Sequence, residues 1–234
     1  MADGNKVQLK YNAYKDVVYA KDNHSEVKME YTILGSLKSR KRGNRKTEFK
    51  YDKVKSILRK TRLFHENRLE NDAEHSWTIC MMALVLHEYA DFDVDINKVI
   101  KMLLIHDIVE IDTGDTFLYD VKRSDVQLKE NTAAERIFGM LDSEQKEYFA
   151  LLWIEFEQKL TPEAKFASAV DRLEPILQNY INKGGSWKEN NITYEMVIKN
   201  NKDIKSASTE IWDFVLRLCD AAVEKGYLER RNNN

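Results

Sequence analysis

Glycine, proline and cysteine are scarce in this 234-residue sequence, which contains 8 glycines, 2 prolines and 2 cysteines. So few residues that break or turn the chain exclude a collagen-like or low-complexity protein and argue against an all-β sandwich. Hydrophobic side chains make up 43% of the residues and charged side chains 32%. This balance excludes a wholly disordered chain and allows a sizeable buried core. We therefore predict a folded, mainly helical protein.

An excess of charge of either sign is also absent, since 37 basic and 39 acidic side chains give a formal net charge of -2. The total therefore indicates neither a nucleic-acid nor a membrane partner. No apolar run approaches the roughly 20 residues that span a bilayer, and residues 1–10 are too polar for a signal peptide. Cys80 and Cys219 cannot form a disulfide framework, which favours a reducing compartment. We expect a soluble, cytoplasmic protein.

The N-terminal region differs from the rest of the chain. Apolar and polar residues alternate over residues 7–11 and 27–33, which predicts two or three short β-strands added to a helical body. Residues 38–46 form a basic linker. It could direct nuclear import or bind phosphate or nucleic acid, but a solvated linker is the favoured interpretation. We assign residues 1–46 to an N-terminal extension that includes this linker.

Helical spacing of apolar residues predominates from residue 47 onward. It predicts helices over residues 49–63, 71–89, 95–110, 126–141, 143–158, 161–182 and 202–225. Asn71 or Asp72 is a suitable N-cap for the second of these helices. Thr161, followed by Pro162 at the first helical position, is a strong start signal for the sixth.

A histidine and an aspartate end one of the most apolar of these segments. His106 and Asp107 follow the run of residues 99–105, where burial without partners would be costly. A divalent cation would bind the imidazole and the carboxylate together, whereas a hydrogen-bonded His–Asp pair inside the fold is the simpler alternative. Glu110 lies one helical turn further on, and Asp115 lies in the turn that follows. This density of polar groups favours the cation.

Two further candidate ligands lie on other predicted helices. His75 occupies the first turn of a helix that is otherwise apolar, and Asp171 lies within a stretch of small and apolar residues. Pro175 cannot donate a hydrogen bond to the carbonyl of Asp171, so the helix could bend there. Two imidazoles and two carboxylates suit an oxophilic divalent cation, for which Mn, Co, Fe, Ni, Zn and Mg are the candidates.

The order of these groups along the chain resembles that of a known family. His75, then His106 with Asp107, then Asp171, each on its own helix, resembles the HD superfamily of metal-dependent phosphohydrolases. The surrounding segments resemble its 5'-deoxynucleotidase-like branch, at residues 68–77, 102–115 and 161–173. The resemblance covers about residues 47–225.

This resemblance implies a fold, a reaction and a set of roles. It implies an all-α HD-domain helical bundle over residues 47–225, with 226–234 as a polar tail, and commonly a homodimer. The metal ligands it implies are His75, His106, Asp107 and Asp171. It implies that Glu110 orients the attacking water and that Asp115 lies near the sugar or the reacting phosphate. The implied reaction releases phosphate from a (deoxy)nucleoside 5'-monophosphate by attack of metal-activated water.

Phosphate recognition departs from the pattern of the family. Nucleotidase relatives place an arginine, often followed by an aromatic residue, some fifteen to seventeen residues before the first histidine ligand. This chain has several basic residues there and no tryptophan. Arg62 is our choice, because a guanidinium binds a phosphate monoester bidentately, while Arg59 and Lys60 remain open. The alternative functions are hydrolysis of another phosphate ester or phosphodiester, and a metal-holding module that binds RNA or protein.

Overall fold

The computed structural model describes residues 8–12, 17–21, 26–30, 51–119 and 123–231. In the N-terminal region it contains an antiparallel three-stranded sheet of β1 (Gln8–Asn12), β2 (Val17–Lys21) and β3 (Glu26–Glu30), in chain order. These strands agree with the predicted short strands. The predicted basic linker at 38–46 lies outside the described residues.

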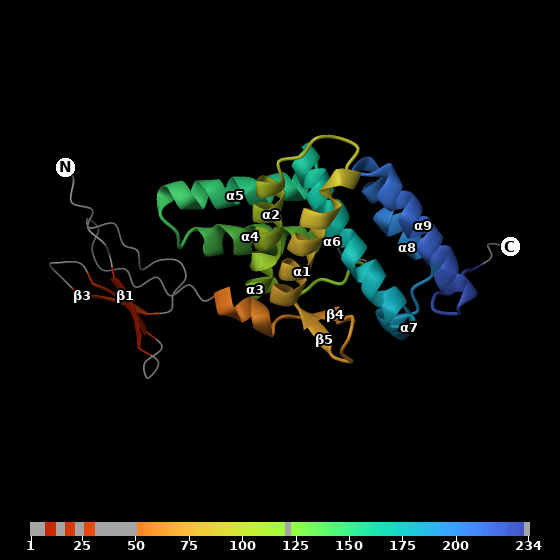
Figure 1. Ribbon diagram of the computed structural model, residues 1–234, viewed down its shortest axis with the longest axis horizontal. Helices are drawn as coiled ribbons and strands as arrows, with labels where there is room; N and C mark the ends of the chain where they lie inside the picture. The colour runs from red at the N-terminus through yellow and green to blue at the C-terminus, as the bar shows by residue number, and fades with distance from the viewer. Residues whose placement is uncertain (1–7, 13–16, 22–25, 31–50, 120–122, 232–234) are drawn as a thin grey trace.

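The rest of the described chain is helical apart from one short hairpin (Figure 1). The α-helices are α1 (Asp72–Leu86), α2 (Ile96–Ile105), α3 (Glu110–Thr113), α4 (Arg123–Phe138), α5 (Ser143–Gln158), α6 (Pro162–Ile181), α7 (Gly185–Glu189), α8 (Tyr194–Asn201) and α9 (Thr209–Glu224). Short 3-10 helices are η1 (Tyr51–Ser56), η2 (His87–Tyr89), η3 (His106–Val109) and η4 (Lys202–Ser206). The predicted all-α class is confirmed. No helix in the described ranges is long and apolar enough to cross a membrane.

The hairpin corrects one prediction. The helix expected over residues 49–63 is wrong: η1 ends at Ser56, and β4 (Leu58–Arg62) pairs antiparallel with β5 (Leu69–Asn71). Apolar residues at Val54, Ile57 and Leu58 have helical spacing, but the backbone of β4 is satisfied by a partner strand instead. The burial of β4 alternates accordingly, with Leu58 exposed and Thr61 buried.

Helix α1 begins where the sequence predicts. Asn71 is its N-cap and accepts a hydrogen bond from the backbone N–H of Glu74 at 3.1 Å, while the Glu74 carboxylate accepts one from Asn71 N at 3.2 Å. This capping box fixes the junction between β5 and α1. His75 therefore enters the fold in the first helical turn, and its side chain is fully buried.

Helix α6 is the central element and contacts α1, α2, α5 and α9 (Figure 1). Thr161 caps its N terminus and Pro162 is its first residue, as predicted. Ala167 and Val170 are completely buried in the core that surrounds it. Asp171 follows directly, so its backbone is held within the buried core.

The C-terminal region contains more separate helices than predicted. The sequence predicts one helix over 202–225, whereas the structure has η4 and then α9, which Ser208 caps by accepting from Ile211 N at 3.1 Å. Helices α7 and α8 were not predicted. Helix α6 ends at Ile181, and Gly184, the N-cap of α7, has a φ of 110°, a left-handed conformation that favours glycine.

Candidate metal centre and substrate cavity

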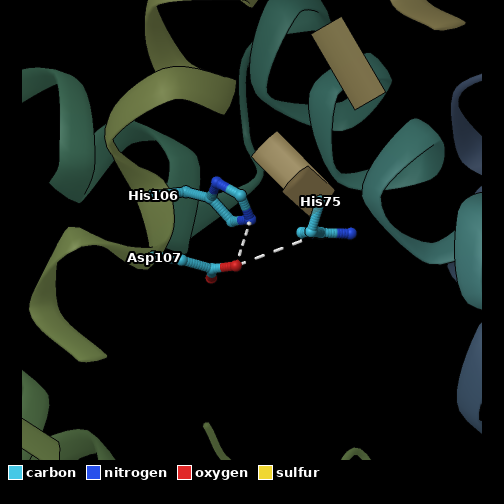
Figure 2. Close-up of side chains that lie close together, drawn as sticks. All are labelled: His75, His106 and Asp107. Carbon is cyan, nitrogen blue, oxygen red and sulfur yellow. Dashed lines mark ion pairs between the residues drawn. The ribbon is translucent and has the colours of Figure 1, made fainter. Parts of the chain in front are cut away.

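The side chains of the four predicted ligands lie close together, although they come from α1, η3 and α6. His75 Nε2 lies 3.1 Å from Asp171 Oδ1, and His106 Nε2 lies 3.1 Å from Asp107 Oδ2. The cross distances are 3.6 Å from His106 Nε2 to Asp171 Oδ1 and 4.0 Å from His75 Nε2 to Asp107 Oδ2. Figure 2 shows His75, His106 and Asp107 directed toward one another.

The switch from α2 to the tighter η3 orients His106. Its Nδ1 lies 2.8 Å from the carbonyl oxygen of Leu103. A carbonyl only accepts, so Nδ1 keeps its proton, and Nε2 is the nitrogen that would give its lone pair to a cation. That buried Nε2 has no hydrogen-bond partner among the described residues. Ligand atoms of His75, His106 and Asp107 lie within 4.8 Å of one another and could hold a divalent cation, and Asp171 Oδ1 lies close to both imidazoles.

The charges around this cluster favour a cation. Burial and Arg59 act to lower the pKa of His75, but the hydrogen bond that the Asp171 carboxylate accepts and the negative charge of Glu174 outweigh them and raise it to about 9. Burial also acts to lower the pKa of His106, but the negative charge of Asp107 outweighs it and raises this pKa to about 10. Burial would raise the pKa of Asp107, yet His106 and Arg59 hold it down at about 2. The field that retains protons on two buried imidazoles also attracts a metal ion.

A cavity of about 800 Å³ opens beside the cluster. Asp107 and Asp171 line it together with Glu110 and Asp115, so the predicted catalytic carboxylates share a cavity with two of the predicted metal ligands. Glu110 is 7% exposed, and burial, followed by repulsion from Asp107, raises its pKa well above the usual range. Asp72, which the sequence analysis did not select, places a carboxylate oxygen within 4.8 Å of those of Glu110 and Asp115.

Of the three basic residues considered for phosphate binding, Arg59 and Lys60 line this cavity and Arg62 does not. Arg59 Nη1 donates to Asp107 Oδ2 at 2.8 Å and lies 4.0 Å from Asp115 Oδ1. Arg62 instead forms an ion pair with Glu189 at 2.9 Å and is not among the cavity-lining residues. The choice of Arg62 was based on the chemistry of its guanidinium, whereas the alternation along β4 turns Arg59 inward.

Sequence reasoning also missed two glutamates behind His75. Glu70 on β5 and Glu174 on α6 are both completely buried and lie 3.7 Å and 3.4 Å from His75 Nδ1. Glu174 lies three residues after Asp171, hence on a neighbouring face of the same helix. This three-residue spacing was the one sequence pattern that could have indicated Glu174.

Comparison with known proteins identifies the family of this chain. The HD domain family matches residues 51–212, so the chain belongs to the HD-domain family. Among curated relatives, 5'-deoxynucleotidase HDDC2 of Danio rerio is 33% identical over 110 residues, which are 47% of this chain and 54% of that protein. The relative of the same name in Dictyostelium discoideum is 32% identical over 136 residues, 55% of this chain and 71% of that protein. The matches therefore span only about half the length of the vertebrate relatives.

Solved structures show the same fold. A predicted metal-dependent phosphohydrolase of Magnetospirillum magnetotacticum is 47% identical, covers 76% of this chain and 90% of its own, and has a TM-score of 0.73. The PH0347 protein of Pyrococcus horikoshii, at 23% identity and a TM-score of 0.53, shares the fold alone, with 71% of this chain and 96% of that chain covered. The resemblance stated from the sequence is confirmed.

Proposed function

We propose that this chain is a metal-dependent phosphohydrolase that releases phosphate from a (deoxy)nucleoside 5'-monophosphate. One observation carries the proposal: a cluster of imidazoles and carboxylates that could hold a metal borders a cavity that a partly buried arginine, Arg59, also lines. The names of the relatives, 5'-deoxynucleotidase and metal-dependent phosphohydrolase, support the reaction class.

The proposed cofactor is a divalent cation held by His75, His106, Asp107 and Asp171. Such a cation, when bound, acidifies a water molecule and polarises a phosphoryl oxygen. Mn, Co, Fe, Ni, Zn and Mg all suit the donor set to some degree, so availability decides among them.

The other residues of the cavity bind and orient in this proposal. The guanidinium of Arg59 binds phosphate oxygens bidentately, because its planar fork matches that geometry. Glu110 exchanges a proton with the attacking water or the leaving hydroxyl, since it is buried beside the cluster. Asp115 also lines the cavity and contacts the sugar or the reacting phosphate.

Substitution of Glu110 tests the catalytic proposal. Glu110→Gln should lower kcat for phosphate release by about 10²- to 10⁴-fold, the usual contribution of a positioned acid or base. Asp112→Asn is the matched control, because Asp112 lies on the same short helix but is exposed and pairs with Arg136. Equal activity of the two variants would contradict the role of Glu110. Turnover of other phosphate esters but of no nucleoside monophosphate would overturn the substrate and keep the reaction.

We also propose that the chain forms a homodimer through α1. Four large apolar side chains on this helix are exposed, at 67% for Trp77, 45% for Met81, 43% for Leu84 and 65% for Val85. Their spacing puts them on one face of the helix, and a contiguous exposed apolar face indicates an interaction site. Analytical ultracentrifugation should find a dimer, and Trp77→Glu should give a monomer. Leu128→Glu, on α4, is the control at similar exposure; a wild-type monomer would refute the proposal.

The domain boundaries and the location are proposals as well. We propose that residues 47–225 carry the activity, that 1–46 is an extension, and that the protein works in the cytoplasm. The span of the family match and the free, buried Cys80 and Cys219 support this assignment. Fluorescence microscopy of the tagged chain should show a cytoplasmic signal. A nuclear signal that is lost when the basic residues of 38–46 are replaced would overturn the location.

A further inference from the structure

The Nδ1 edge of the His75 imidazole faces polar groups that have no part in the proposed reaction. Its Nδ1 lies 3.4 Å from Glu174 Oε2 and 3.7 Å from Glu70 Oε2, and all three side chains are completely buried. Neither carboxylate has a hydrogen-bond partner among the described residues. Two carboxylates buried in this way are costly unless they interact with a specific partner. The partner that both of them face is the Nδ1 edge of His75.

A second metal ion at this position is the less economical explanation. It would need the lone pair of Nδ1, while the Nε2 lone pair of the same ring faces Asp107 and Asp171. A neutral imidazole has one lone pair and one N–H, so it cannot serve both sides. With Nε2 facing the metal cluster, Nδ1 carries a proton that only an acceptor can satisfy. A carboxylate acceptor fixes the ring and makes the imidazole a stronger ligand.

The two glutamates differ in one contact. Glu70 Oε2 also lies 3.9 Å from Arg59 Nε, across the β4–β5 hairpin. Glu174 has no ion pair with an arginine or lysine in the described part of the chain. The carboxylate of Glu70 therefore lies between a proposed metal ligand and the proposed phosphate-binding guanidinium.

We propose that Glu70 and Glu174 are positioning residues that hold the Nδ1–H of His75, and that Glu70 also positions Arg59. Both glutamates then raise the affinity of the cluster for its cation. Only Glu70 links that cluster to anion binding in the cavity. The second half of this proposal rests on the proposed function, because it takes Arg59 to bind phosphate.

The affinity for metal, measured in the absence of substrate, tests the first half of the proposal, that both glutamates position His75. Glu70→Gln and Glu174→Gln keep the size of the side chain and remove its charge. Each should weaken Co²⁺ binding, measured by calorimetric titration of the metal-stripped protein, by about 10- to 100-fold. Each should also change the visible spectrum of bound Co²⁺. Glu66→Gln, an exposed glutamate between the strands of the same hairpin that pairs with Arg68, is the control and should leave both unchanged.

Binding of inorganic phosphate to the metal-saturated protein tests the second half. Glu70→Gln should weaken it by about tenfold, in line with loss of a positioning partner, while Glu174→Gln should leave it within about twofold. Near-ultraviolet circular dichroism confirms that each variant is folded, and Glu70→Asp and Glu174→Asp replace any glutamine variant that is not.

The outcomes separate this proposal from the proposed function. Unchanged Co²⁺ affinity in both folded variants would overturn the positioning of His75, whatever the enzyme hydrolyses. An equal loss of phosphate binding in both variants, or no phosphate binding by the wild type, would overturn the link through Glu70. Neither titration depends on turnover, so failure to hydrolyse nucleotides would refute the proposed function alone.

Discussion

Replacement of Arg59 distinguishes phosphate binding from metal binding most sharply. Arg59 is 13% exposed, and its Nη1 lies within 4.0 Å of carboxylate oxygens of Asp107, Asp72 and Asp115. A guanidinium held among so many acids is fixed in place before substrate arrives, so little side-chain entropy remains to be lost on binding. Arg59→Ala removes this cation, and Arg59→Lys keeps its charge without the planar fork.

The magnitude follows from the kind of bond that is lost. A hydrogen bond to a charged group contributes about 1.5–3 kcal/mol, and about 1.36 kcal/mol corresponds to a tenfold change in rate. Arg59→Ala should therefore lower kcat/KM for a nucleoside monophosphate by about 10- to 150-fold. Arg59→Lys should lie near the lower end of that range, because a point charge still attracts phosphate.

In contrast to its effect on kcat/KM, Arg59→Ala should not weaken the binding of the metal. Arg59 Nη1 lies 2.8 Å from Asp107 Oδ2, so its positive charge repels a cation at that carboxylate. Arg59→Ala should consequently bind Mn²⁺ at least as tightly as the wild type in a calorimetric titration. A variant of a metal ligand, such as His106→Ala, should lose both metal and activity.

The matched control is Arg62→Ala. Arg62 lies on the same strand but pairs with Glu189, so phosphate release at saturating metal should stay within about twofold of the wild type. The reasoning is refuted if Arg62→Ala is the inactive variant, or if Arg59→Ala keeps full kcat/KM.

Buried titratable and capping groups give further predictions. The pKa of His75 is raised to about 9 and that of His106 to about 10, so below those pH values a cation must displace their protons. The apparent Mn²⁺ affinity should therefore rise with pH from about 6 to 9. An affinity that does not change with pH would contradict this. Burial raises the pKa of Cys80 to about 11 and that of Cys219 to about 12, so iodoacetamide should leave both thiols intact in the folded protein and alkylate both after unfolding, as intact mass would show. Asn71→Ala removes the cap of α1 and should lower the free energy of unfolding by about 1 kcal/mol, seen as a melting temperature about 2–4 °C lower. Asn71→Asp should melt close to the wild type.

Much of the helical framework could be predicted from local signals. Asn71 and Thr161 cap their helices because side-chain acceptors satisfy free N–H groups within a few residues. The apolar run before His106 likewise indicated a buried helix that ends in polar groups. Such interactions are encoded within one or two turns of the chain, so a sequence pattern can show them.

The parts that were missed depend on distant residues. Val54, Ile57 and Leu58, which precede or begin strand β4, have helical spacing, and only the pairing of β4 with β5 makes it a strand. The same pairing decides that Arg59, rather than Arg62, faces the cavity. Glu70 and Glu174 are more than a hundred residues apart, and nothing local indicates that both face His75. Tertiary contact, which periodicity does not report, sets the geometry around the candidate metal centre.

Phosphate release from a panel of nucleoside and deoxynucleoside 5'-monophosphates tests the central claim most directly. Metal-stripped protein would be reloaded with Mn²⁺, Co²⁺ or Mg²⁺, and Asp107→Ala would be assayed in parallel. The account predicts release that requires a metal, differs among the nucleotides and is abolished in Asp107→Ala. Wild-type protein that is folded and holds metal, yet releases no phosphate from any nucleotide with any of these metals, would contradict it.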